Sequence, residues 1–154
     1  MKWSEVLMDK SLQNLPYKIE TNEWGQIVMS PASNKHAYFQ GKIAATFTYQ
    51  LPNGKAMTEC SIETDKGVKV ADVCWCSNDF INKHGFETPY TKAPEICVEI
   101  LSPSNDKREM DEKRQLYFIQ GAIEVWIVSE EGDVEHYNSG GIISHSQYNV
   151  QLSF

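Results

Sequence analysis

The 154-residue sequence contains no apolar run close to the roughly 20 residues that a membrane-spanning helix requires. Residues 1–13 are too polar and too charged for the apolar region of a secretory signal. These two absences predict a cytoplasmic protein with no membrane segment. Internal repeats, low-complexity tracts and linkers are also absent, so we expect a single domain over residues 1–154.

Cysteine is scarce, and its spacing fits neither a zinc knuckle nor a disulfide-stapled miniature protein. All four cysteines, Cys60, Cys74, Cys76 and Cys97, fall in strand-like runs. Free cysteine is among the residue types most often buried. The simplest interpretation is therefore a set of reduced thiols in the core.

Basic residues are outnumbered, because 14 Lys and Arg face 21 Asp and Glu, which gives a net charge of -7. A protein that coats nucleic acid normally has a basic surface, so this balance argues against that class. It is compatible with an enzyme whose acidic groups hold cations. Any contact with DNA would need a local basic patch, although such residues are more often simply solvated. The candidates are Lys83, Lys92, Lys107, Arg108 and Arg114.

Hydrophobic periodicity and turn residues predict an α/β or α+β sheet domain. Helices are expected at about 3–9, from Ser33 or Asn34 to Tyr49, and at about 105–120, with a short helical or looped piece at 77–85. Strands are expected near 17–20, 26–29, 56–63, 67–76, 95–101, 124–129, 134–138 and 143–153. Ser104 or Asn105 is the expected N-cap of the helix at 105–120.

Two carboxylates lie inside runs that otherwise have the pattern of buried strands. In "VKVADVCWC", Asp72 shares a strand face with Cys74, and in "PEICVEIL", Glu99 shares a face with Cys97. Burying an unpaired carboxylate costs several kcal/mol. If the two strands are neighbours, Asp72 and Glu99 converge and their repulsion requires a cation, for which a hard divalent metal is suitable.

The helix that follows Glu99 has a lysine within its apolar stripe. At 100° per residue, Met110, Leu116 and Tyr117 define the stripe, and Lys113 falls between them. We therefore expect Lys113 to lean toward the sheet, where an ammonium can neutralise a developing negative charge or position a water. The alternative is that its stem packs on the core while the ammonium reaches solvent.

The helix that begins near Ser33 shows the same pattern in weaker form. His36, Gln40, Ile43 and Phe47 are spaced at i, i+4, i+7 and i+11, so His36 and Gln40 extend the apolar stripe at its N-terminal end. A single histidine in this place is more often a hydrogen-bonded core residue than a functional group.

Three segments carry a resemblance to a known family: "YKIETNEWGQIVMSPASNKH" (17–36), "VKVADV" (68–73) and "PEICVEILSPSNDKREMDEKRQLYFIQGAIEVWIV" (94–128). Together they resemble the Uma-two family of endonucleases, within the PD-(D/E)-x-K, restriction-endonuclease-like superfamily. The "VEILSPS" block and its continuation are the most specific part. The resemblance implies a restriction-endonuclease-like core, a central mixed β-sheet flanked by helices, with Asp72 and Glu99 as ligands of Mg²⁺ or Mn²⁺.

The resemblance also assigns two further residues and shows two departures. Glu20 matches the family's acidic residue before the glycine turn, and His36 matches its histidine at the start of the next helix, which implies supporting or proton-handling roles. Ala71 replaces the usual proline before the aspartate, and Leu101 stands where the superfamily has its lysine. The ammonium must therefore come from elsewhere, and Lys113 is the plausible substitute.

These residues predict a metal-dependent endonuclease that hydrolyses phosphodiester bonds of DNA. The metal held by Asp72 and Glu99 would activate water and polarise the phosphate, and Lys113 would offset phosphoryl charge. The alternative is a catalytically decayed module that binds nucleic acid or a protein partner without turnover, in which Glu99 and Lys113 form a structural ion pair.

A homodimer is also considered, because enzymes that cut both strands of DNA commonly dimerise. Trp24, Tyr38, Tyr90 and Phe154 are candidates for a groove or a dimer contact. Most aromatic residues in a domain of this size build the core instead, and this is the preferred interpretation.

Overall fold

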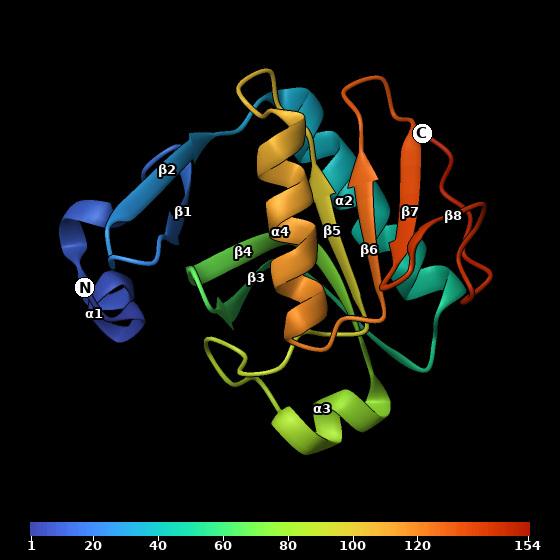
Figure 1. The fold of residues 1–154 in the computed structure, drawn as a ribbon, viewed down its shortest axis with the longest axis horizontal. Helices are drawn as coiled ribbons and strands as arrows, with labels where there is room; N and C mark the ends of the chain where they lie inside the picture. Colours follow the sequence, from blue (N-terminus) through green and yellow to red (C-terminus); the bar gives the residue numbers. More distant parts are fainter.

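A computed structural model of residues 1–154 shows a six-stranded sheet between two helical layers (Figure 1). In sheet order the strands are β3 (Gly54–Thr64), β4 (Gly67–Ser77), β5 (Ile96–Ile100), β6 (Glu124–Val128), β7 (Val134–Asn138) and β8 (Gly141–Ile143). Strands β5 and β6 are parallel and every other neighbouring pair is antiparallel. The expected mixed sheet flanked by helices is confirmed.

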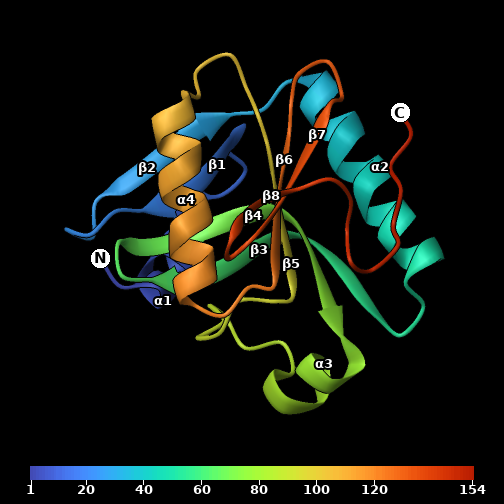
Figure 2. The same ribbon diagram turned by 45° about the vertical axis from the view of Figure 1, so that its right-hand side comes forward.

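The helices bury their apolar stripes on opposite faces of this sheet, as Figure 2 shows for α2 and α4. Helix α2 (Asn34–Gln50) places Phe39, Ile43 and Phe47 in one core cluster. Helix α4 (Lys107–Ile119) and the short α3 (Asn78–His84) contribute Met110, Tyr117 and Phe80 to the other. Residues 73–76 of β4 and 96–98 of β5 alternate between these two clusters, as expected for strands covered on both faces.

The N-terminal arm, residues 1–31, lies beside this core and is drawn in blue in Figure 1. It contains α1 (Trp3–Met8), a 3₁₀ turn η1 (Lys10–Leu12), and the antiparallel pair β1 (Tyr17–Thr21) and β2 (Ile27–Pro31). Side chains and backbone of β1 anchor the arm to β4. The Val68 N–H donates to Thr21 Oγ1 (2.8 Å), the Lys69 ammonium to Thr21 O (2.9 Å), and the Val70 N–H to Glu20 Oε2 (2.7 Å).

The expected N-cap of α4 is wrong. Asp106 caps the helix, because its carboxylate accepts a hydrogen bond from Glu109 N at 2.7 Å. Asn105 instead accepts from the Ser102 N–H and hydroxyl and donates to Glu109, so it closes the preceding turn. Asp, Asn and Ser are comparable capping residues, so composition alone does not choose among neighbouring positions.

The strand expected at 143–153 is also wrong, since only β8 (Gly141–Ile143) forms. The segment after β8 is held by side-chain contacts with the buried Glu124. Its carboxylate accepts from the Ser146 hydroxyl (2.8 Å), the Gln147 N–H (2.7 Å) and the Trp126 indole (2.8 Å). One buried acid thus replaces a strand ladder as the anchor of the C-terminal segment.

The four cysteines are free and buried, as expected. Of the aromatic residues considered for a dimer contact, Tyr90 is buried and belongs to the core, whereas Trp24 and Tyr38 are exposed. None of the helices has both the length and the apolar character needed to cross a membrane.

We predict that Gly67→Ala destabilises the protein by more than about 1 kcal/mol, because Gly67 has φ +88° and an added Cβ would lie 2.4 Å from Asn22 O and 2.5 Å from Thr21 O. The change strains the β3–β4 turn and pushes the arm off β4. Urea denaturation measures the effect. The control is Gly41→Ala, in open space within α2, which should stabilise by about 0.5–1 kcal/mol. Equal effects of the two changes would contradict the close contact at Gly67.

Candidate active site

Asp72 and Glu99 stand where β4 and β5 separate. The pairing of these strands runs from Trp75–Ile96 to Val73–Val98 and ends there, one residue short of both acids. The two carboxylates are almost fully buried, with 1% of each residue exposed. The expectation that they lie on neighbouring strands is therefore confirmed.

The freed backbone groups at this point are satisfied by side chains. Asp72 Oδ2 accepts from the Ile100 N–H at 2.8 Å, and the Gln40 amide donates to Asp72 O at 2.9 Å. On the other side of Asp72, Glu59 of β3 has φ +57°, and its carboxylate also accepts from Gln40 at 3.0 Å. The sheet is thus opened around Asp72 on both sides, and Gln40 bridges the opening.

The Lys18 ammonium lies between the two acids. Its Nζ is 3.1 Å from Asp72 Oδ1 and 3.2 Å from Glu99 Oε2, and only 11% of the side chain is exposed. Strand β1 delivers this side chain from the arm. A cation therefore stands where repulsion between the carboxylates is greatest, although it is an ammonium of the protein itself.

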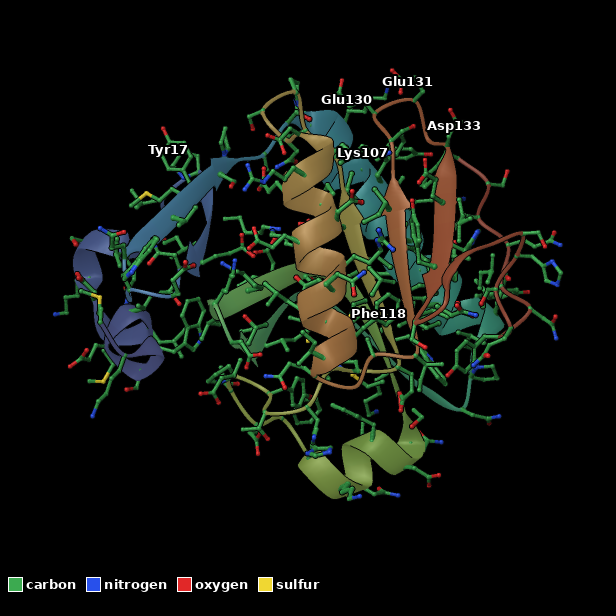
Figure 3. All side chains as sticks on the ribbon, in the orientation of Figure 1. Tyr17, Lys107, Phe118, Glu130, Glu131 and Asp133 are labelled. Carbon is green, nitrogen blue, oxygen red and sulfur yellow. The ribbon has the colours of Figure 1, made fainter.

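Lys113 approaches from α4 and pairs with two carboxylates. Its Nζ is 2.9 Å from Glu20 Oε1 and 3.4 Å from Glu99 Oε1, and the lysine is buried. The Tyr117 hydroxyl donates to the same Glu99 oxygen at 2.6 Å. The inward direction predicted for Lys113 is confirmed, and in Figure 3 nitrogen- and oxygen-bearing side chains fill the space between β1 and α4.

The charges of the cluster divide unequally between the two central acids. Burial alone would raise the pKa of Asp72, but the Lys18 charge and a hydrogen bond with His36 outweigh it and hold this pKa well below its usual range. Burial raises the pKa of Glu99, and the nearby carboxylates add to that effect, so Lys113 and Lys18 compensate it only in part. The pKa of Glu99 is therefore shifted in the opposite direction from that of Asp72.

His36 and Glu20 complete the cluster. His36 Nε2 is 3.3 Å from Asp72 Oδ2, and this hydrogen bond raises the pKa of the imidazole against the opposing effect of burial. His36 Nδ1 is buried and has no hydrogen-bond partner. Burial of Glu20 would raise its pKa, but the Lys113 and Lys18 charges lower it, so Glu20 is a stable carboxylate partner for Lys113.

A cavity of about 400 Å³ opens beside this cluster. Lys18, His36, Glu99 and Lys113 line one side of it, and Ser102 and Asn105 of the β5–α4 loop line another. The ammonium groups of Lys18 and Lys113, the His36 imidazole and the Glu99 carboxylate therefore border a space large enough for a phosphate group and water.

The donor set fits a hard divalent cation with few protein ligands. No group of three or more His, Cys, Asp or Glu side chains has the geometry to hold a metal ion. The protein offers two carboxylate oxygens, Asp72 Oδ1 and Glu99 Oε2, which both contact the Lys18 ammonium. Mg²⁺ is commonly bound by one or two carboxylates, with water and substrate phosphate as its other ligands.

Comparisons with known proteins show the family of the chain and a similar fold. The model of the Uma2 family, described as "Putative restriction endonuclease", matches residues 10–153. The chain belongs to the Uma2 family. No curated protein matches it. Its fold is similar to that of a crystal structure described as "a putative nuclease belonging to DUF820" from Anabaena variabilis, with 16% identity, a TM-score of 0.65, and coverage of 84% of this chain and 82% of that chain.

All five site residues expected in this Uma2 chain, Glu20, Asp72, Glu99, Lys113 and His36, meet in one cluster. Their placement is as expected, whereas their roles stay predictions. Leu101, at the superfamily's lysine position, packs against the apolar core. The lysine that contacts Glu99 from a helix is Lys113 of α4.

Sequence reasoning missed Lys18, Tyr117 and the bridging role of Gln40. Tyr117 and Gln40 were placed in helical apolar stripes, and nothing in those stripes identifies which polar atom finds a partner. Lys18 had one available signal, because it alternates with Ile19 and stands two residues before Glu20, on the same face of β1. The face shared by Lys18 and Glu20 is the one that meets the site.

The basic residues proposed as a DNA patch are divided by the fold. Lys83 lies on α3, at the opposite end of the molecule from the β5–α4 loop in Figure 1. Arg114 pairs with Asp111 at 3.1 Å and stacks on the Tyr137 ring at 3.9 Å. These five residues therefore do not form one continuous surface.

We predict that Lys113→Met destabilises the protein by about 3–5 kcal/mol, because it leaves Glu20 without its direct ion-pair partner and Glu99 with Lys18 alone. Urea denaturation compares it with Lys66→Met, which breaks an exposed pair with Glu112 and should cost no more than about 1 kcal/mol. Adding Glu20→Gln to Lys113→Met should restore part of the loss. If both substitutions lowered the free energy of unfolding by a similarly small amount, Lys113 would not be a required counter-charge of the buried acids.

Proposed function

We propose that this Uma2 chain is a metal-dependent nuclease that hydrolyses phosphodiester bonds of DNA. The observation that carries the proposal is that Asp72 Oδ1 and Glu99 Oε2 both contact one cation, the Lys18 ammonium. They do so beside a cavity large enough for a phosphate. The family description and the fold of the similar nuclease structure support the same reaction class.

Asp72 and Glu99 would hold Mg²⁺ or Mn²⁺, and when bound the ion lowers the pKa of a water and polarises the scissile phosphate. Asp72 suits this role because its pKa is held low, so that its carboxylate is charged. Its second oxygen is fixed by the Ile100 N–H and faces His36, which leaves Oδ1 for the cation.

Lys113 would stabilise charge on the phosphoryl oxygens. Its ammonium lines the cavity and is held 2.9 Å from Glu20 Oε1, so it is oriented before substrate binds. Glu20 acts as a positioning residue, because its other oxygen accepts from the Val70 N–H and fixes β1 to β4. Tyr117 fixes the Glu99 oxygen that faces Lys113.

The distribution of charge disfavours approach of DNA at one end of the molecule. In Figure 3 the acidic turn that carries Glu130, Glu131 and Asp133 lies at the upper end of the molecule, across the sheet from the arm. A second cavity of about 180 Å³ lies beside Glu20 and Lys113, and its lining combines Lys66 and Lys69 with further glutamates. Because Lys66 pairs with Glu112 and Lys69 donates to Thr21 O, we assign neither lysine a phosphate contact.

We predict that Asp72→Asn and Glu99→Gln each lower cleavage of plasmid DNA by more than about 100-fold, since losing a group that only supports a metal ligand already costs about 10–100-fold. Cleavage by the wild type should require Mg²⁺ or Mn²⁺ and stop in EDTA. Agarose gels measure product, and circular dichroism verifies that each variant is folded. The control is Glu131→Gln, an exposed acid outside the cluster, which should leave cleavage unchanged.

The alternative function is a module that binds without turnover. It also requires the ion pair of Glu99 with Lys113. The two functions differ in their response to metal. A binding module should retain DNA without cutting it, and divalent ions should not change its melting temperature. That result, together with no cleavage by the wild type in Mg²⁺ or Mn²⁺, would reject the nuclease proposal.

A further inference from the structure

We propose that the Lys18 ammonium is a built-in cation that a divalent ion displaces from the carboxylates, and that the displaced ammonium then binds the substrate phosphate. Lys18 would thereby couple metal binding to substrate binding. This inference rests on the proposed function, and it adds a residue that the sequence patterns did not single out.

The position of Lys18 and the position of the metal exclude each other. Lys18 Nζ contacts Asp72 Oδ1 at 3.1 Å and Glu99 Oε2 at 3.2 Å, the two oxygens that converge from different strands. A magnesium ion bound to the same oxygens lies about 2.0–2.1 Å from each. That ion would be too close to the ammonium for both to remain, so one cation must leave.

Lys113 does not compete for the same place. It contacts the other Glu99 oxygen, Oε1, and its shorter contact is with Glu20. It makes no contact with Asp72. Each oxygen of Glu99 therefore has its own lysine, and only Lys18 stands between the two acids. Lys113 can stay in place when a metal binds, whereas Lys18 cannot.

The cavity provides a destination for Lys18. Its side chain already lines the 400 Å³ space, together with Lys113, Ser102 and Asn105. The backbone of β1 is anchored through Glu20 and Thr21, so the four-carbon side chain can turn while the strand stays fixed. Away from the carboxylates, the ammonium needs a new anionic partner. The lining of the cavity has one other acid, Glu59, and a phosphodiester bound there supplies a further partner.

This exchange makes metal and phosphate binding cooperative. Without phosphate, the ion must displace an ammonium that loses two buried partners at once. With phosphate present, the ammonium gains a replacement partner, so the ion binds more tightly. By linkage, the ion must strengthen phosphate binding by the same factor.

The test compares Mn²⁺ binding to the wild type and to Lys18→Met by isothermal titration calorimetry, without DNA. Removing the competing ammonium should tighten Mn²⁺ binding at least about 10-fold, which corresponds to about 1.4 kcal/mol. Saturating Mn²⁺ should also raise the melting temperature of Lys18→Met more than that of the wild type, because the ion replaces the missing charge. Plasmid cleavage by the same variant should fall, since the ammonium no longer reaches the phosphate.

Lys10→Met is the matched control, because it removes an exposed lysine from the same arm. It should leave Mn²⁺ affinity and cleavage unchanged. Lys18→Gln provides a second comparison with a neutral polar side chain, and it should change in the same direction as Lys18→Met. If neither Lys18 variant folds even in saturating Mn²⁺, the ion does not replace the ammonium and the inference is overturned.

The remaining outcomes separate this inference from the proposed function. Absence of Mn²⁺ binding by both the wild type and the Lys18 variants would reject the metal site, and the role of Lys18 with it. Equal Mn²⁺ affinity in the wild type and the variants, with metal-dependent cleavage intact, would overturn the inference alone. Tighter Mn²⁺ binding with unchanged cleavage would show that Lys18 blocks the metal but does not contact the phosphate.

Discussion

The structure depends on compensating the negative charge of three buried carboxylates. Glu20, Asp72 and Glu99 are each at least 96% buried. A buried carboxylate without a partner costs several kcal/mol, and three in contact would cost more because they repel one another. Lys18 of β1 and Lys113 of α4 supply the opposite charge, and His36 of α2 makes a hydrogen bond with Asp72. The packing of α4 and of the arm against the sheet is therefore tied to this one electrostatic requirement.

The same requirement explains where the sheet is irregular. Regular pairing on both sides of Asp72 would satisfy the backbone through the ladder, whereas here the Gln40 amide donates to Asp72 O and the Ile100 N–H donates to the Asp72 carboxylate. Glu59, opposite Asp72, adopts a left-handed conformation that costs about 1–3 kcal/mol for a residue other than glycine. Such irregularities are typical of functional sites, where side chains must be aimed at a ligand and not at a neighbouring strand.

Much of this arrangement could be predicted from the sequence because the decisive signals are local. Strand alternation placed Asp72 and Glu99 on the core face, and helical phase turned Lys113 inward. Helical spacing also placed His36 in an apolar stripe, and the resemblance added Glu20 and gave His36 a role. The missed contacts are those decided by packing across the chain. The sequence patterns did not single out Lys18, because only the docking of β1 on β4 places its ammonium between the acids.

The errors in the fold have a similar origin. Ser104, Asn105 and Asp106 are all good capping residues, and the geometry of the β5–α4 loop selects the last of them. The segment after β8 has the alternation of a strand, but Glu124 binds its backbone and side chains instead. In both places the local structure depends on a side-chain contact that the neighbouring sequence does not reveal.

The arm that carries Lys18 and Glu20 has a consequence for how this molecule folds. Lys18 is 54 residues from Asp72 and 81 from Glu99 along the chain. Contacts of such long sequence separation form only after extensive loop closure, which slows folding. The central cluster thus depends on contacts that join the first strand to strands much later in the chain. Intermediates in which the sheet has collapsed before β1 docks would expose Asp72 and Glu99 to water, where their charges are tolerated.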